Sequence, residues 1–120
     1  NGYVILKFFL NISKEEQRKR FMARIDTPSK NWKLSSSDIR ERQYWNKYQA
    51  VYEKAINATS TKKNPWYVIP SDDKWYSRLI VSDILTKRIE KLPLAYPTMS
   101  PKQEKDLELA KKLLEDEGKY

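Results

Sequence analysis

The chain has 120 residues and a mass of 14.4 kDa, which suits one domain or a part of a larger one. Lysine and arginine number 24 against 16 acidic residues, so the formal charge is +8, and an anionic partner is expected. Because cysteine and histidine are absent and only two glycines occur, these residues exclude disulfides, thiolate and histidine metal sites, histidine bases and glycine-rich phosphate loops.

The amino-terminal stretch predicts a strand followed by a helix. Tyr3–Leu10 is a nearly continuous apolar run that only Lys7 interrupts, which is typical of a strand buried on both faces, as in a parallel sheet. Ser13-Lys14-Glu15-Glu16 matches the S-x-x-E capping box. A helix is therefore expected from this box to about Ile25.

A basic loop and a long helix are expected next. Thr27-Pro28-Ser29 ends the first helix, and the loop Lys30–Lys33 carries two lysines and one tryptophan. Aromatic and apolar residues recur at helical spacing from about Ser37 to Ala58, which predicts one continuous helix. A polar linker, Thr59–Asn64, follows it.

The second half predicts one strand and two helices. Trp66–Ile69 lies between two prolines and predicts a short strand. Ser71-Asp72-Asp73 then begins a helix that Pro93 ends. Ser100-Pro101-Lys102-Gln103 has the features of a helix start and predicts a last helix to about Glu117.

The alternation of strands and helices predicts an α/β fold. Two strands alone cannot cover both faces of Tyr3–Leu10 or pair both of its edges. We therefore expect these to be the last strands of a larger parallel sheet whose earlier strands lie upstream. The alternative is a small α+β domain whose two strands pair with each other.

Positive charge is concentrated in the first 50 residues, which hold 11 basic and 5 acidic side chains. Arg20 and Arg24 are four residues apart and share a helix face. Arginine suits polyanions because its planar fork binds phosphate oxygens bidentately and stays charged. This pattern favours a phosphate-binding surface, and the alternative is a solvated charged face with local acidic partners.

The turn after the second strand is a second candidate site. In open α/β sheets, ligands bind at the carboxyl ends of the strands, and Ser71-Asp72-Asp73-Lys74 occupies that place. Asp72 or Asp73 could orient a base or ribose, and Lys74 could contact phosphate. The alternative is that the turn only caps the helix that follows.

Several motifs resemble a known family. They are K-F-F-L-x-I-S-K-E-E-Q-x-x-R-F at 7–21, W-K-x-S-x-x-D at 32–38, A-T-S-T at 58–61 and P-W-Y-V-I-P at 65–70. Over about residues 2–90 the chain resembles the carboxy-terminal part of the type-2 polyphosphate kinase family. The resemblance implies a P-loop kinase fold like that of thymidylate kinase, with residues 1–92 in the kinase domain, a lid at about 13–58, and a linker and helix at 93–120.

The resemblance also implies a reaction. The family transfers a phosphoryl group between inorganic polyphosphate and a nucleoside mono- or diphosphate with Mg²⁺. Its Walker A and Walker B motifs lie upstream of the matched stretch, so the main Mg²⁺ ligands are expected outside this chain and no metal ligand is assigned within it. We expect these residues alone to be inactive, and the complete protein to be a cytoplasmic homo-oligomer with no membrane partner.

The resemblance assigns roles to individual lid residues. Arg20, Arg24 and Arg42 are expected to contact the transferred phosphate as catalytic residues. Lys30 and Lys33 are expected to hold the polymer. The remaining substrate-binding residues are Asp38, which would orient one of the arginines, and Asp72 and Lys74, which would lie at the nucleotide end.

Two other functions remain open from the sequence. The net charge and the tryptophans also fit a basic nucleic-acid-binding module, which predicts binding that weakens steeply with salt. The acids interspersed among the basic residues argue against it. The other alternative is a non-catalytic assembly fragment that uses the last helix, with Leu107 and Leu114 on its apolar side, to form an oligomer.

Overall fold

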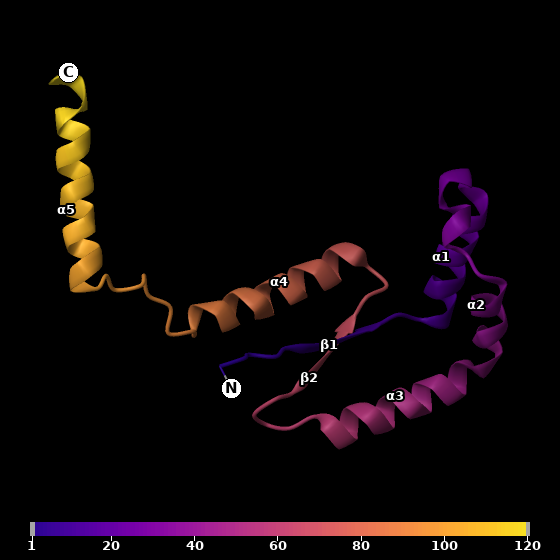
Figure 1. The fold of residues 1–120 in the computed structure, drawn as a ribbon. Coiled ribbons are helices and arrows are strands. Elements are labelled where there is room, and N and C mark those ends of the chain that lie inside the picture. Colours follow the sequence, from indigo (N-terminus) through magenta and orange to yellow (C-terminus); the bar gives the residue numbers. More distant parts are fainter. Residues whose placement is uncertain (1, 120) are drawn as a thin grey trace. The chain divides into compact units, whose positions relative to one another are not determined.

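The computed structural model describes residues 2–119, which divide into two units, residues 2–90 and 91–119. The first unit forms, in chain order, β1 (Lys7–Asn11), α1 (Lys14–Asp26), the 3₁₀ helix η1 (Pro28–Lys33), α2 (Ser36–Glu41), the 3₁₀ helix η2 (Arg42–Tyr44), α3 (Trp45–Thr59), β2 (Trp66–Pro70) and α4 (Lys74–Glu90) (Figure 1).

Strands β1 and β2 pair in parallel and hold the first unit together. The register runs from Lys7 opposite Trp66 to Asn11 opposite Pro70. One further bond extends the pairing, since the Ser71 amide donates to the Asn11 carbonyl at 2.8 Å. Parallel strands need a crossover, and helices α1 to α3 supply it. The predicted α/β class is therefore confirmed. The two strands pair with each other, and the crossover connects them.

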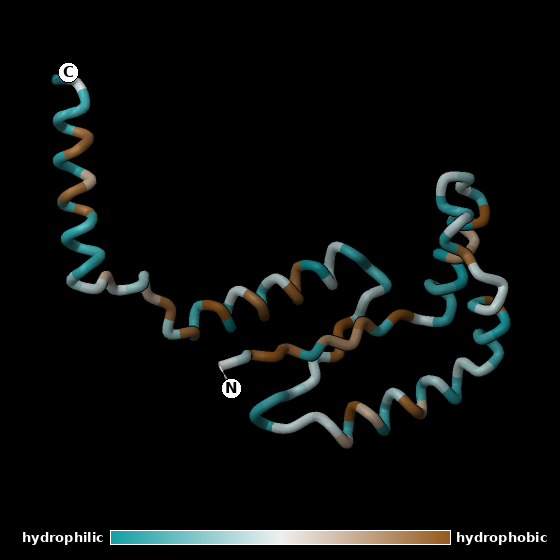
Figure 2. The backbone as a smooth tube through the Cα atoms, viewed as in Figure 1, coloured by the Kyte–Doolittle hydropathy of each residue, from teal (hydrophilic) through white to brown (hydrophobic). Residues whose placement is uncertain are grey.

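The core of the first unit is small. Ile69 on β2 is the one buried hydrophobic residue among those described, at 3% exposure. Phe8 stacks on Tyr67 across the strand pair at 5.6 Å between ring centroids, and Phe9 packs on Tyr52 of α3 at 5.1 Å. Helices α3 and α4 lie on either side of the strand pair (Figure 1), and hydrophobic residues are frequent in both strands and in α4 (Figure 2).

The prediction of a strand over Tyr3–Leu10 was wrong in its extent. The observed strand is Lys7–Asn11, because β2 offers only five partner residues and the stretch before Lys7 has no partner among the described residues. Leu10 is 59% exposed among the described residues. Its burial by further strands upstream stays a prediction.

Lys7 has a defined role within this otherwise apolar strand. Its ammonium donates to the carbonyl of Thr59, the last residue of α3, at 2.8 Å and lies 5.3 Å from the centre of the Trp66 ring. The carbonyls at a helix carboxyl end carry partial negative charge and lack partners within the helix. Lys7 therefore fixes the end of α3 against the start of both strands.

The prediction of one continuous helix over Ser37–Ala58 was also wrong. The structure has three pieces, α2, η2 and α3, because Tyr44 leaves the helical region with φ −94° and ψ 17°. Neither glycine nor proline marks the break. Arg42, at the start of η2, is bound to the first turn of α1, and this long-range contact accompanies the change of direction.

The remaining helix predictions agree well with the structure. The first helix is α1, and Ser13 caps it as expected, with its hydroxyl accepting from the Glu16 amide at 3.1 Å. Helix α4 begins at Lys74, where Asp73 accepts from two amides of the first turn. In the second unit, α5 (Pro101–Asp116) has a complete capping box, and η3 (Glu117–Lys119) follows it. No helix within residues 2–119 is long and apolar enough to span a membrane.

Candidate functional site

The carboxyl ends of β1 and β2 and the start of α1 surround an open hollow of about 400 Å³. Parallel strands end at the same edge of a sheet, so the residues that follow both strands come together there. The hollow is lined by Asn11, Ile12, Ser13, Lys14, Trp45, Gln49, Pro70, Ser71 and Asp72. Of the predicted site residues, this hollow contains Asp72, as the position of the turn after β2 led us to expect.

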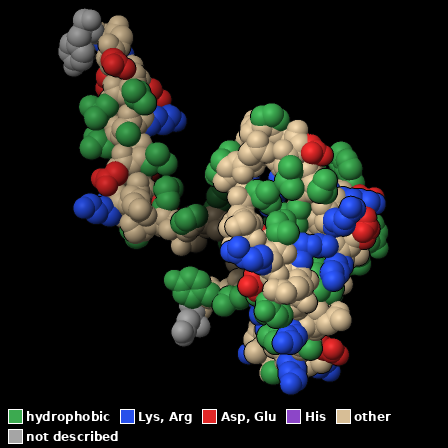
Figure 3. Space-filling model, turned by 90° about the vertical axis from the view of Figure 1, so that its right-hand side faces the viewer, with side chains coloured by type: hydrophobic (Ala, Val, Ile, Leu, Met, Phe, Trp, Pro, Cys, Tyr) green, Lys and Arg blue, Asp and Glu red, His purple; other side chains and the backbone are tan. Residues whose placement is uncertain are grey.

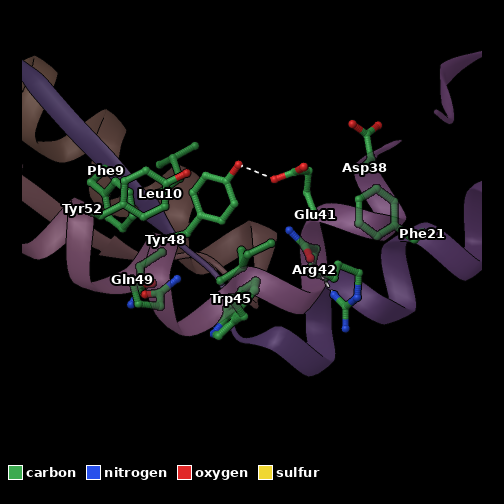
Figure 4. Close-up of a pocket in the computed structure, with 13 residues that line it drawn as sticks. Phe9, Leu10, Phe21, Asp38, Glu41, Arg42, Trp45, Tyr48, Gln49 and Tyr52 are labelled. Atoms are coloured by element: carbon green, nitrogen blue, oxygen red, sulfur yellow. Dashed lines mark hydrogen bonds between the residues drawn. The ribbon is translucent and has the colours of Figure 1, made fainter. Parts of the chain in front are cut away.

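A second hollow of about 470 Å³ lies between β1, α1 and the α2–α3 segment (Figure 4). Its walls are largely apolar and aromatic, and they include Phe9, Phe21, Trp45 and Tyr52. The predicted residues Asp38 and Arg42 also line it. Two of the predicted lid residues therefore lie in the wall of this hollow. The wall does not include the predicted Arg24, Lys30, Lys33 and Lys74.

One hydrogen bond spans the rim of this second hollow. Tyr48 donates from its hydroxyl to a carboxylate oxygen of Glu41 at 2.7 Å (Figure 4). This bond, together with the negative charge of Glu41, raises the pKa of Tyr48 above its ordinary value. The contact ties α2 to α3 across the break at η2.

Arg20 connects α1 with the turn that follows β2. Its Nη2 donates to the Ser71 carbonyl at 2.7 Å and to the Asp72 carbonyl at 3.2 Å, and its Nε donates to Glu16 at 3.0 Å. The Arg20 and Glu16 side chains are about a quarter exposed, so this ion pair is better shielded than a fully solvated one. Most of the Arg20 fork is thus bound to groups of the protein itself.

Asp72, in the same turn, makes a second contact with the start of α1. One of its carboxylate oxygens accepts from the Ser13 backbone amide at 2.7 Å. This hydrogen bond is the largest cause that lowers the pKa of Asp72 below its ordinary value of 3.8, followed by the Ser13 side chain and the nearby charges of Arg20 and Lys19. A carboxylate at a helix amino terminus is also favoured by the helix dipole.

The Asp72 contact predicts a dependence of stability on acid. Because the pKa of Asp72 is lowered in the folded chain, its contribution is complete above the ordinary value of 3.8 and is lost as the pH falls through the folded value. Denaturant unfolding from about pH 5 down to about pH 2 should therefore show a steeper loss of stability in the wild type than in Asp72→Asn. Parallel curves for the two proteins would contradict this assignment.

Arg42 makes a second link to the start of α1. Both of its terminal nitrogens donate to the Lys14 carbonyl at 3.2 Å, and Nη1 also donates to the Gln17 side chain at 2.6 Å. Arg42 is half-buried. Its predicted contact with phosphate stays a prediction, and in this structure it positions η2 against α1.

Arg24 lies near the carboxyl end of α1, and Lys30 and Lys33 lie in η1, away from the contacts of Arg20 and Arg42. We name α1 together with η1 the basic arm. Asn31 folds η1 back on α1, because its side-chain amide donates to the carbonyls of Arg24 and Ile25, both at 2.8 Å. The Arg24 guanidinium lies 5.6 Å from the centre of the Phe21 ring, and the Lys33 ammonium lies 5.1 Å from that of Trp32.

Arg24, Lys30 and Lys33 are the cations of the basic arm that we expect to be available to a ligand, whereas Arg18 and Arg20 pair with acids. Among residues 2–119, no salt bridge joins Arg24, Lys30 or Lys33 to an acid, and the two lysines are exposed. Figure 3, which faces the α1 and α2 side, shows Lys and Arg side chains gathered on this unit. Such a cluster raises the local concentration of anions.

Asp38 and Lys74 are the two remaining predicted site residues. Within the described part of the chain, no salt bridge joins Asp38 to an arginine, so its predicted orienting role stays a prediction. Lys74 is the exposed first residue of α4, beside the strand ends. No group of three or more acidic residues among residues 2–119 could hold a metal ion.

The sequence reasoning found some partners of the arginines and missed others. The alternative of a charged face with local acidic partners included Glu15 and Glu16, and these two pair with Arg18 and Arg20. Gln17 was not singled out, although it receives the shortest bond from Arg42. Gln17 and Arg42 are 25 residues apart, so no local spacing pointed to this contact.

The chain is similar to several proteins over most of its length. It is 55% identical over 117 residues to the "Uncharacterized protein in chlN 3'region" of Leptolyngbya boryana, covering 98% of this chain and 86% of that protein. It is 52% identical over 107 residues to the ADP-polyphosphate phosphotransferase of Rhodopseudomonas palustris, covering 89% of this chain but only 37% of that protein. The crystal structure of Polyphosphate Kinase 2 from Arthrobacter aurescens TC1 superposes with a TM-score of 0.77 at 42% identity, covering 88% of this chain and 39% of that one.

Parallel strands joined by a helical crossover define an α/β fold, and the superposition on the Arthrobacter aurescens protein agrees with the P-loop kinase class expected from the sequence. The family model for Polyphosphate kinase 2 matches residues 1–95. The chain belongs to the Polyphosphate kinase 2 family. It spans less than two fifths of the length of the Rhodopseudomonas and Arthrobacter proteins.

Proposed function

We propose that this chain supplies the lid and two strands of an enzyme that transfers a phosphoryl group between inorganic polyphosphate and a nucleoside mono- or diphosphate. The observation that carries the proposal is the basic arm, whose Arg24, Lys30 and Lys33 are free of acidic partners among residues 2–119. Membership of the Polyphosphate kinase 2 family supports it. Cytoplasmic location and assembly as a homo-oligomer stay predictions from the resemblance.

The chemistry of phosphoryl transfer explains why a basic arm is useful. Negative charge is spread over the oxygens of the transferred group in the transition state, and the protein contributes mainly by positioning and electrostatic stabilisation. Arg24 would neutralise charge on the reacting phosphate, and Lys30 and Lys33 would hold neighbouring phosphates of the polymer. Lys74, beside the strand ends, would face the nucleotide end.

A metal ion belongs to the proposal as well. Enzymes of this kind use a divalent cation, which we propose to be Mg²⁺, to neutralise phosphate oxygens. The residues described here do not offer a cluster of carboxylates that fits such an ion. Every role derived above is therefore one that the lysines and arginines of this chain perform.

Competition between polymers tests the binding part of the proposal with the chain itself. Inorganic polyphosphate of defined length should bind the 120-residue chain and displace single-stranded DNA of equal total charge. A nucleic-acid-binding module predicts the opposite order, because base stacking on aromatic side chains adds affinity that polyphosphate lacks. Displacement of polyphosphate by DNA at equal charge would therefore contradict the proposal.

A chimera tests the catalytic part. The 107 matched residues of the Rhodopseudomonas palustris enzyme are replaced by those of this chain, and polyphosphate-dependent phosphorylation of ADP is measured. We expect transfer within about tenfold of the parent rate, since the phosphate-facing residues are proposed to act equivalently. A chimera that unfolds cooperatively like the parent but transfers no phosphate would overturn the proposal.

A further inference from the structure

The first turn of α1 departs from a standard capping box. The Ser13 hydroxyl accepts from the Glu16 amide, but the Glu16 carboxylate does not return a bond to the Ser13 amide. In α5, by contrast, the side chains of Ser100 and Gln103 make both bonds of the box. The Ser13 amide is instead bound by Asp72, a residue 59 positions away.

The Glu16 carboxylate, which does not complete the capping box, takes part in a long-range contact through Arg20. Glu16 holds the Nε of Arg20, and the Nη2 of Arg20 donates to the carbonyls of Ser71 and Asp72. Ser71 is 5% exposed and is itself bonded to β1 through the Asn11 carbonyl. The turn that receives these bonds is therefore fixed to the sheet.

We propose that Ser13, Glu16, Arg20 and Asp72 form a latch that sets the position of the basic arm relative to the strand ends. Arg20 and Asp72 are then positioning residues, which act through α1 instead of touching phosphate. Each side of the junction contributes one charged group, since the Arg20 guanidinium of α1 donates to the turn and the Asp72 carboxylate of the turn accepts from the Ser13 amide. Hydrogen bonds to charged groups are stronger than neutral ones. This inference rests on the proposed function, because the latch affects binding only if the basic arm contacts polyphosphate.

The latch should strengthen polyphosphate binding, because an arm that is already held in place loses less conformational entropy when the polymer binds. A polymer binds better when the helix that carries its cationic contacts is already held in one position before binding. Simple electrostatics predicts the opposite for the loss of Asp72, since Asp72→Ala raises the formal charge from +8 to +9. The sign of the change therefore separates a latch from a general charge effect.

Amide hydrogen exchange in the full chain tests the latch without reference to activity. In Asp72→Ala, exchange at the Ser13 amide should accelerate about tenfold or more, because a bond to a charged acceptor is lost. The matched control is Glu53→Ala, which makes the same charge change on the exposed side of α3. The amides of β2 report whether the fold is intact, and unchanged exchange at Ser13 with β2 intact would overturn the proposal.

Affinity for inorganic polyphosphate provides the functional test. Asp72→Ala should bind about threefold or more weakly than the wild type, whereas Glu53→Ala should bind as well or more tightly. Arg20→Lys keeps the charge but loses the guanidinium fork, so this variant should also bind polyphosphate more weakly. The variant that combines Arg20→Lys and Asp72→Ala should lose less binding free energy than the sum of the two single losses.

The two hypotheses fail in different ways. A wild-type chain that does not bind polyphosphate contradicts the proposed function, and the exchange of the Ser13 amide still decides the latch. A wild type that binds, with Asp72→Ala binding like Glu53→Ala, contradicts the latch and leaves the proposed function standing.

Discussion

Replacing Arg24 by alanine is expected to reduce polyphosphate-dependent phosphoryl transfer about a hundredfold, the effect of removing one group that stabilises transition-state charge. Arg24 lies on α1, half-buried, with its guanidinium near the ring of Phe21 and with no salt bridge to an acid among residues 2–119. The measurement is kcat and KM for polyphosphate in the chimera with the Rhodopseudomonas palustris enzyme.

Arg18 supplies the matched control for Arg24. It lies on the same helix, is 61% exposed at its side chain and pairs with Glu15 at 3.6 Å. Arg18→Ala makes the same charge change and should leave kcat within about twofold, because a solvated charge at the surface contributes little. If both variants lose activity equally, general charge and not the position of Arg24 is responsible.

Ile69→Ala is expected to have the largest effect on stability, a loss of about 2–4 kcal/mol from the deleted side chain and the cavity that remains. Ile69 is the one buried hydrophobic residue among those described, at 3% exposure, and it pairs with Leu10 in the sheet. Chemical denaturation of the full chain measures this change. A loss of that size is a large part of the stability of a small domain.

Val68 gives the comparison within the same strand. It precedes Ile69, points to the opposite face and is 50% exposed. Val68→Ala should lower stability by less than about 1 kcal/mol, which reflects strand propensity more than packing. Equal losses at the two positions would mean that β2 is stabilised by its backbone pairing and not by the side chain of Ile69.

Local signals in the sequence were sufficient for most elements of this fold. The caps at Ser13 and Ser100 and the prolines around Trp66–Ile69 act on their own neighbours, so they could be read without a structure. The extent of β1 depends on the length of its partner strand, and the break at η2 accompanies contacts between Arg42 and α1. Contacts between distant segments set both features, and no local pattern reveals them.

The site shows the same division. The spacing of Arg20 and Arg24 correctly placed both on α1, but it could not separate their surroundings. Arg20 meets backbone carbonyls 51 and 52 residues away, whereas Arg24 meets the ring of Phe21. Arg20 and Arg24 therefore look equivalent on a helical wheel but make different contacts. The difference arises because the fold places only the Arg20 end of α1 against the end of β2.

The attachment of η1 to α1 makes the basic arm vulnerable to a chemical change at a single amide. Asn31 holds two carbonyls through one NH₂ group, and an acid at this position would present oxygens to those carbonyls in place of donors. Hydrolytic deamidation of Asn31 would therefore detach η1 from the helix and add a negative charge between Lys30 and Lys33. The damaged arm would lose both its shape and part of its attraction for anions.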